Sequence, residues 1–423
     1  MGMMNIKDVA SLAGVSPSTV SRVLNGKDYV NEATRQKVLD AVKQTNYQPN
    51  VLAKSLKMGR TNTICLLIPA LRHLIFPEIA RGVEDEARKT GFTVVLCNTG
   101  EDPALEQGYI EKMKTRWIDG FVVCSAIGRT DHIHALRDEG FPLVLVNRFR
   151  EQDIGRIDTV TSDNYQAAYQ AVQYLIRSGH KRIALAAGRE ELYFYRERHR
   201  AYRQALEDSG IGYDPALVMQ DTNVDKCFYH QLHRLMRTDR APDAVFCSSD
   251  PKAFEVMHAL HDMGKRIPED VAVMGFDNVS LSTMVEPPLT TMSQHLYEMG
   301  VVGAKNLIQQ ICYKEKTGEL PPPNHHVLDV DLIVRRSTRC PPPKKTQGGC
   351  DEPAWHQPLE LAHRAGRGLS GPAHPGGAAG LYRGGAAHEH PYPARRAGRG
   401  DPRHRAGGKP LRRHGPRAGS FQL

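Results

Sequence analysis

The stretch NIKDVASLAGVSPSTVSRVLN, residues 5–25, decides the fold of the first part of the chain. It opens with apolar residues that recur at helical spacing and form one face, namely Ile6, Val9, Ala10 and Ala13. Gly14 ends this predicted helix. Ser16 followed by Pro17 starts a second helix, because serine is a favoured N-cap and proline is favoured at the first helical position.

The second predicted helix has an apolar side and a polar side. Val20, Val23 and Leu24 face inward. The outer side carries five polar residues: Ser18, Thr19, Ser21, Arg22 and Asn25. Two helices joined by a short turn that contains glycine, the second with a polar outer face, are typical of a helix-turn-helix. A helical hairpin packed on a core is the alternative interpretation.

Two further segments favour the helix-turn-helix. A third helix begins at Asn31 and can close a three-helix core with Ala33, Val38, Leu39 and Val42. Residues 51–57, VLAKSLK, are basic and amphipathic but too few for a stable isolated helix, so we expect them to become ordered on DNA. We therefore predict a helix-turn-helix head over residues 1–49 and a hinge helix with its linker over residues 50–60.

Residues 5–60 resemble the DNA-binding head of the lactose/galactose repressor (LacI/GalR) family, through the strings IKDVA, LAGVS, STVSRVLNG and Y-PN-A-SL-GRT. The resemblance places Ser16, Pro17, Ser18 and Arg22 at the major groove, where Arg22 offers two donors to a guanine edge and hydroxyls such as that of Thr19 reach bases or phosphates. Residues that match positions near phosphates are Asn5, Ser21, Asn25 and Asn31.

The same resemblance assigns Leu56 to the leucine that wedges between base pairs in the minor groove, at the centre of a palindrome. A core leucine is the alternative. Pro17 stands where many relatives carry a larger polar or aromatic residue that contacts a base, so we expect weak direct recognition at that base.

The middle of the chain alternates short apolar runs with amphipathic stretches. The runs are residues 63–69, 93–98, 120–125 and 142–147 and, after a crossing near residues 158–163, residues 182–188, 216–220, 243–249 and 271–277. This βαβ repetition predicts parallel, doubly wound sheets. The fold class is therefore α/β: a three-helix head followed by a two-lobed, periplasmic-binding-protein-like domain over residues 61–338.

Open parallel sheets bind ligands at the carboxyl ends of their strands. The predicted ligand-binding residues stand after these strands or at a helix start: Phe76, Asn147, Arg148, Arg198, Ser249, Asp250 and Asp277. Each could instead cap a helix or meet solvent. They match the family's effector pocket, except that most relatives have Asp in place of Asn147 and Asn in place of Ser249.

The resemblance implies a sugar or sugar derivative as effector. A phosphorylated compound is the alternative, because several arginines are expected near the cleft: Arg129, Arg148, Arg150, Arg198 and Arg200. We expect no metal, cofactor or catalytic residue. Dinucleotide-binding, P-loop and nucleophile-elbow strings are absent from the sequence, and the cysteines lack metal-ligand spacing.

The net charge of +9 divides unevenly along the chain. Residues 1–60 carry +5, residues 61–338 carry −6 and residues 339–423 carry +10. The last segment holds 16 Gly and 12 Pro and no Ile, Val, Met or Asn, so it cannot bury enough apolar surface to fold. We interpret residues 339–423 as a disordered, out-of-frame or read-through tail. A basic arm that binds nucleic acid is the alternative.

Together these features predict a sequence-specific transcriptional repressor that binds a palindromic double-stranded operator as a homodimer and responds to a small molecule. The segment 77–90 is a candidate dimer interface, and no leucine heptad follows residue 338 to form a tetramer. No apolar stretch spans a membrane and no secretory signal is evident, which predicts a cytoplasmic protein. The alternatives are a cytoplasmic sugar-binding protein and a sugar-modifying α/β enzyme. Whether the effector releases or tightens DNA binding stays open.

Overall fold

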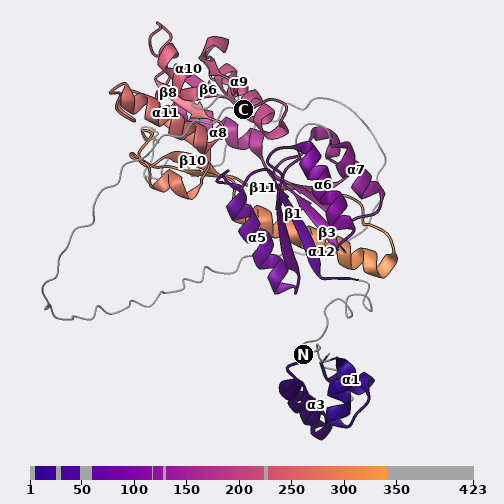
Figure 1. The fold of residues 1–423 in the computed structure, drawn as a ribbon. Coiled ribbons are helices and arrows are strands. Elements are labelled where there is room, and N and C mark those ends of the chain that lie inside the picture. Colours follow the sequence, from indigo (N-terminus) through magenta and orange to yellow (C-terminus); the bar gives the residue numbers. More distant parts are fainter. Residues whose placement is uncertain are drawn as a thin grey trace, which may run out of the picture. The chain divides into compact units, whose positions relative to one another are not determined.

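The computed structural model describes residues 5–24, 30–47, 60–116, 118–126, 130–222 and 227–340 (Figure 1). Its first part is a head of three helices, α1 (Ile6–Ala13), α2 (Pro17–Leu24) and α3 (Glu32–Thr45). They bury a small apolar core made of Val9, Ala10, Ala13, Val20, Val23, Val38 and Ala41. The predicted three-helix head is confirmed.

Two residues of α3 do not lie where the sequence placed them. Ala33 is exposed and Leu39 is 43% exposed, although both were expected in the core. The buried face of α3 runs through Val38 and Ala41, with Val42 packed beside them. Because successive residues of a helix are rotated by about 100°, Leu39 points away from that face.

The first lobe is built on a six-stranded parallel sheet with the order β11-β5-β4-β3-β1-β2. Its strands are β1 (Thr63–Ile68), β2 (Thr93–Asn98), β3 (Gly120–Val123), β4 (Leu143–Val146), β5 (Asp158–Ser162) and β11 (His325–Leu328). Helices α5 (Phe76–Lys89) and α12 (Leu296–Thr317) cover one face, and α6 (Pro103–Lys114) and α7 (Asp131–Asp138) cover the other.

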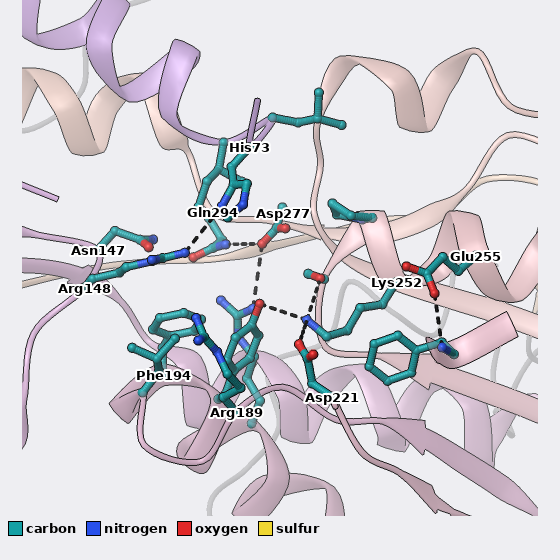
Figure 2. Close-up of a pocket in the computed structure, with 18 of the residues that line it drawn as sticks. His73, Asn147, Arg148, Arg189, Phe194, Asp221, Lys252, Glu255, Asp277 and Gln294 are labelled. Atoms are coloured by element: carbon teal, nitrogen blue, oxygen red, sulfur yellow. Dashed lines mark hydrogen bonds and ion pairs between the residues drawn. The ribbon is translucent and has the colours of Figure 1, made fainter. Parts of the chain in front are cut away.

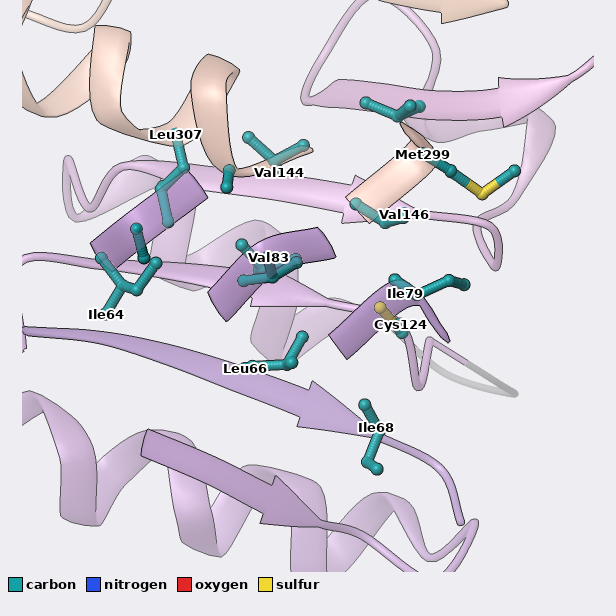
Figure 3. Packing of buried hydrophobic residues seen from close by; sticks show 14 of the residues in the cluster. Ile64, Leu66, Ile68, Ile79, Val83, Cys124, Val144, Val146, Met299 and Leu307 are labelled. Atoms are coloured by element: carbon teal, nitrogen blue, oxygen red, sulfur yellow. The ribbon is translucent and has the colours of Figure 1, made fainter. Parts of the chain in front are cut away.

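The central strand β1 shows why this lobe has helices on both faces. Ile64, Leu66 and Ile68 point to the side of α5 and α12, while Cys65 and Leu67 point to the opposite side. All five are buried. Such a continuous apolar run fits a strand that is covered on both faces. Figure 3 shows the first of these cores, in which side chains of α5 and α12 meet those of the strands.

The second lobe repeats this architecture on a sheet with the order β12-β10-β9-β8-β6-β7. Its strands are β6 (Ile183–Ala186), β7 (Val218–Met219), β8 (Ala244–Cys247), β9 (Ala272–Asp277), β10 (Thr290–Ser293) and β12 (Asp331–Ile333), of which only β12 pairs antiparallel. Helices α8 (Asn164–Arg177) and α9 (Tyr193–Asp208) cover one face, and α10 (Cys227–Leu235) and α11 (Asp250–Asp262) the other.

The chain passes between the two sheets three times: after β5, between β10 and α12, and between β11 and β12. The predicted crossing near residues 158–163 is therefore itself strand β5, and the passage follows it. Short 3-10 helices complete the lobes at Glu151–Asp153, Pro215–Leu217 and Ser280–Thr283. In the described part of the chain no helix is both long enough and apolar enough to cross a bilayer.

The predicted tail begins with a residue that belongs to the folded body. The carbonyl oxygen of Arg339 accepts hydrogen bonds from the hydroxyls of Tyr174, at 3.2 Å, and Ser178, at 2.9 Å. Its guanidinium donates to the carbonyl of Glu269. Ordered structure thus continues past the predicted boundary at residue 338. Residues 341–423 lie outside the described residues, and their assignment as a tail stays a prediction.

Helices α5 and α12 cross in backbone contact. A Cβ atom added at Gly82 would lie 2.0 Å from the carbonyl oxygen of Tyr297, and one added at Gly300 would lie 2.1 Å from that of Ile79. Both glycines are buried. Only residues without a side chain allow the two helices to approach this closely. The two glycines therefore determine how α12 packs on the first lobe.

We expect Gly82→Ala to destabilise the protein by about 1–3 kcal/mol, because the added methyl group overpacks a backbone contact. Gly108→Ala is the matched control, since Gly108 lies in helix α6 with no atom within 4 Å of an added Cβ. It should leave stability unchanged or raise it by about 0.5–1 kcal/mol. Urea unfolding of the full chain measures both, and equal effects of the two substitutions would contradict the close crossing.

Candidate functional site

The predicted base-contacting side chains lie along α2 and on the residue that precedes it. Ser16, Pro17, Ser18 and Arg22 are exposed, while Thr19 and Ser21 are half-buried. The Ser16 hydroxyl accepts a hydrogen bond from the backbone N–H of Thr19 at 3.2 Å, which confirms it as the cap of α2. The exposed side of this helix therefore offers hydroxyl groups at its N-terminal end and the guanidinium of Arg22 in its last turn.

Two asparagines that were assigned to phosphate contacts also begin helices. The Asn5 side chain caps α1 and accepts from the N–H of Lys7 at 2.8 Å, and Asn31 caps α3 by accepting from that of Thr34 at 2.8 Å. Both are exposed at helix N-termini, which attract phosphate groups. The predicted contacts Asn25 and Leu56 lie outside the described residues, as does the hinge segment 51–57.

A cavity of about 530 Å³ lies between the two lobes, a size typical of small-molecule sites (Figure 2). The first lobe contributes Arg72, His73, Leu74, Ile75, Glu101, Asn147 and Arg148. The rest of the wall is Arg189, Leu192, Phe194, Tyr195, Arg198, Asp221, Cys227, Phe228, Ser249, Pro251, Lys252, Glu255, Asp277 and Gln294. Five of the seven predicted ligand-binding residues are thus brought together: Asn147, Arg148, Arg198, Ser249 and Asp277.

The other two predicted residues, Phe76 and Asp250, are fully buried and do not form part of the cavity wall. Phe76 opens α5, and the Arg148 guanidinium lies 5.2 Å from its ring centroid. The carboxylate of Asp250 accepts from the Thr291 hydroxyl at 2.6 Å and from the Val279 N–H at 2.9 Å. These two residues lie behind the cavity wall, because the first residues of α5 and α11 point into the core.

Arg198 is 1% exposed and is held by four neighbouring residues. Its Nε and Nη2 donate to Oδ1 of Asn164 at 2.9 and 2.8 Å, and its Nη1 donates to the carbonyl of Ser248 at 2.6 Å. Nη1 also lies 3.7 Å from Oδ1 of Asp277, and the guanidinium stacks 3.6 Å above the ring of Phe276. Arg198 lies in the second turn of α9, not at its start as the sequence suggested.

Asp277 and Asn147 end strands of the two lobes in unusual backbone conformations. Their φ angles are 125° and 68°, which lie in a region that residues other than glycine rarely adopt. Residues held in such conformations cluster at binding sites. Burial raises the pKa of Asp277 to about 6 and outweighs the attraction of Arg198 and Lys252, which lowers it.

Three buried polar atoms of the wall have no hydrogen-bond partner within the described residues: Asn147 Oδ1, Gln294 Oε1 and Arg148 Nε. Their side chains are 4%, 1% and 6% exposed. Buried polar atoms are almost always paired, so three unpaired ones at one cavity indicate that a ligand supplies their partners. The two amide oxygens need a hydrogen-bond donor, and Arg148 Nε needs an acceptor. A hydroxyl group is both a donor and an acceptor, so a hydroxylated molecule can pair with all three.

The cavity also contains residues that the sequence interpretation missed. His73, Glu101, Arg189, Lys252 and Gln294 were not predicted to bind a ligand. Lys252 could have been found, because it follows Ser249 by one helical turn in α11. Gln294 follows β10, a strand that the apolar runs did not reveal.

The raised pKa of Asp277 makes the stability of the ligand-free protein depend on pH. The native pKa of about 6 exceeds the value of 3.8 expected for the unfolded chain, so the native state binds the proton more tightly and loses stability as the pH rises from 4 to 6. Asp277→Asn removes this loss. We expect the stability of the variant relative to wild type to rise by about 1 kcal/mol between pH 5 and pH 7.

Thermal unfolding at the two pH values measures this change. Asp270→Asn is the control, because Arg266 lowers the pKa of Asp270 to about 2 and the group does not titrate in that window. A relative stability of Asp277→Asn that is independent of pH would contradict the assignment.

Comparisons with known proteins agree with both parts of this description. Residues 5–50 match the family model "Bacterial regulatory proteins, lacI family", and residues 61–329 match "Periplasmic binding proteins and sugar binding domain of LacI family". The HTH-type transcriptional regulator RegA of Clostridium saccharobutylicum is 37% identical over 335 residues, which cover 79% of this chain and 99% of RegA.

Two further relatives are similar over the same extent. The ribose operon repressor of Halalkalibacterium halodurans is 36% identical over 80% of this chain and 98% of its own length. The solved structure of the transcriptional regulator CelR in complex with cellobiose is 32% identical, covers 79% of this chain and 99% of its own, and superposes with a TM-score of 0.60. These relatives are transcriptional regulators and not enzymes, so the predicted absence of catalysis agrees with the family. The chain belongs to the LacI family of bacterial regulatory proteins and is a DNA-binding transcriptional regulator controlled by an effector.

Proposed function

We propose that the protein is a cytoplasmic repressor that binds a palindromic operator as a homodimer and senses a sugar or sugar derivative in the cavity between its lobes. The observation that carries the proposal is a pair of features in one chain. The head presents an exposed α2 with Arg22, and the body holds a cavity with unpaired buried polar atoms. The CelR structure contains cellobiose and another relative is a ribose operon repressor, which supports a sugar ligand.

The ligand acts by changing how the lobes close. The Glu101 carboxylate of the first lobe lies 3.6 Å from the Arg189 guanidinium of the second. Outside the cavity, Arg196 of the second lobe pairs with Glu151 of the first at 3.0 Å. A ligand that prefers one closure shifts the population of that state. A coupling of about 1–3 kcal/mol changes operator affinity by about 5- to 150-fold.

The linker that leads to the head is fastened to the base of the first lobe. Arg60 pairs with Glu315 of α12 at 2.9 Å. The Asp119 carboxylate accepts from the backbone N–H groups of Thr61 and Thr63, each at 3.1 Å. A movement of this lobe therefore displaces residue 60. In a dimer, this would change the distance between the hinge segments of the two subunits.

Selection of bound duplexes from a random pool by the full-length protein tests the proposal. We expect enrichment of a palindrome with a flexible central step such as CG. Repeating the selection with candidate sugars should alter its yield. Failure to enrich any motif, with and without sugars, would contradict the proposed operator binding.

Arg22→Ala is expected to weaken binding to the selected operator by about 1–3 kcal/mol, because a bidentate contact to a guanine is lost. Binding to unrelated DNA should weaken much less. Lys37→Ala removes the same charge from an exposed position of α3 and serves as control. Fluorescence anisotropy with both duplexes measures the losses. Equal losses of Arg22→Ala on both would show that Arg22 contacts only phosphates.

A further inference from the structure

The cavity between the lobes is unevenly charged. In the part of the second lobe around Arg198 and Lys252, each of these two cations faces a carboxylate. Arg198 lies 3.7 Å from Asp277, and Lys252 lies 3.7 Å from Asp221. Figure 2 shows Glu255 on the same side, next to Lys252 and away from Arg148. With two cations and three carboxylates, this end of the cavity has no excess of positive charge.

The other end, formed by the first lobe together with Arg189 of the second lobe, has more cations than carboxylates among its lining residues. Glu101 alone lies 3.0 Å from Arg148 and 3.6 Å from Arg189, and Arg72 also lines the wall. His73 lies 3.8 Å from the same carboxylate. Burial lowers the pKa of His73, and Arg148 lowers it further while Glu101 raises it. Two guanidinium groups therefore share one carboxylate, and a third, that of Arg72, lines the same part of the wall.

Arg148 is held rigidly and still has a donor to offer. Its Nη1 donates to Glu101 at 3.0 Å, and its guanidinium lies against the ring of Phe76. Its Nε is buried without a hydrogen-bond partner in the described structure, although the side chain is 6% exposed. Leaving a buried guanidinium N–H unpaired is costly, so a ligand acceptor is expected there.

The neighbouring wall offers acceptors instead. The unpaired oxygens of Asn147 and Gln294 and the carboxylate of Asp277 accept hydrogen bonds from hydroxyl groups. Figure 2 shows Gln294 between Arg148 and Asp277, with Asn147 next to Arg148; the Gln294 amide donates a hydrogen bond to the Asp277 carboxylate. One ligand that fills the cavity meets both the acceptors and the excess cations.

We infer that the effector is an anionic sugar, with its carboxylate or phosphate held between Arg148 and Arg189 and its hydroxyls held by Asn147, Gln294 and Asp277. Two carboxylate oxygens or three phosphate oxygens match guanidinium donors in fork geometry. The inference rests on the proposed function only in taking this cavity as the effector site.

Matched neutral and acidic sugars test the inference on the full-length protein. The probes are D-glucose with D-gluconate, D-glucuronate and D-glucose 6-phosphate, and D-galactose with D-galacturonate. Isothermal titration calorimetry should show at least about tenfold tighter binding of one acidic member than of its neutral parent, and the difference should shrink at high salt. The acid that binds distinguishes a carboxylate from a phosphate.

Arg189→Gln tests the site itself, because Arg189 is partly exposed and its replacement leaves the core intact. We expect it to remove the preference for the acid, while Arg189→Lys retains part of it. Arg200→Gln is the matched control, since Arg200 lies on α9, pairs with Glu197 and does not line the cavity.

Three results would overturn the inference: a neutral parent that binds as tightly as its acids, an Arg189→Gln variant with unchanged affinity for the acid, or no binding of any acidic probe. A neutral sugar that binds and alters operator affinity would reject the anionic effector and leave the proposed function standing. Conversely, an acid that binds while duplex selection fails would reject operator binding alone.

Discussion

Arg198→Met is expected to abolish the response to effector and to destabilise the second lobe by about 3–5 kcal/mol. The guanidinium is 1% exposed, so its removal leaves the buried carboxylate of Asp277 without the stronger of the two cations that attract it, Lys252 being the other. It also leaves the Asn164 side chain and the Ser248 carbonyl without their donors. Methionine fills much of the volume, which separates loss of charge from loss of packing.

Effector affinity should fall by about 100-fold, because Arg198 orients the carboxylate that binds the hydroxyls and a hydrogen bond to a charged group contributes about 1.5–3 kcal/mol. Urea unfolding and calorimetry with the tightest probe sugar measure the two losses. Arg200→Met changes the same residue type on the same helix at a position that is 64% exposed, and it should have little effect on either. Retention of full affinity by Arg198→Met would show that the site does not depend on Asp277 being held by Arg198.

The head was predictable from sequence because its signals are local. Ser16 before Pro17, Gly14 at the end of α1 and Asn31 before α3 each act within a few residues, and the structure uses all three as helix caps. The inner side of α3 was less predictable. Leu39 is as apolar as Val38, and only the position of the other two helices decides which of them is buried.

In the body the central strands of each sheet were predictable. Strand β5, after which the chain passes to the second lobe, was not. β1, β4, β8 and β9 are continuous apolar runs because helices cover both of their faces. Strand β5, with the sequence DTVTS, is just as buried but satisfies its threonines and serine by hydrogen bonds. Composition therefore did not distinguish it from a loop.

Part of the cavity wall was predictable from the strands that the apolar runs had located. Asn147 and Asp277 end strands that the apolar runs located, so their place at the carboxyl edge followed directly. Glu101 and Arg189 belong to different lobes, and their proximity depends on how the lobes close. The excess of arginines around a single carboxylate became visible only when both lobes were in place.

Val20→Asp is expected to abolish operator binding and to leave effector binding intact. Val20 is 0% exposed, and the core to which it belongs contains seven buried side chains among the described residues of the head, all of them small or medium-sized. Small domains bury little apolar surface and are correspondingly marginal. An unpaired buried carboxylate costs on the order of several kcal/mol, which exceeds what such a core supplies, so the head should unfold while the two lobes keep their own cores.

Leu39→Asp is the matched control, because it makes the same kind of change at a residue that is 43% exposed on α3. It should leave the head folded, with at most a modest loss of DNA affinity from the added negative charge. Anisotropy with the selected operator and calorimetry with the tightest probe sugar, both on the full chain, separate the two functions. If Val20→Asp also removed sugar binding, head and body would depend on each other for folding. If Leu39→Asp unfolded the head, Leu39 would belong to the core after all, and the packing of α3 would have to be revised.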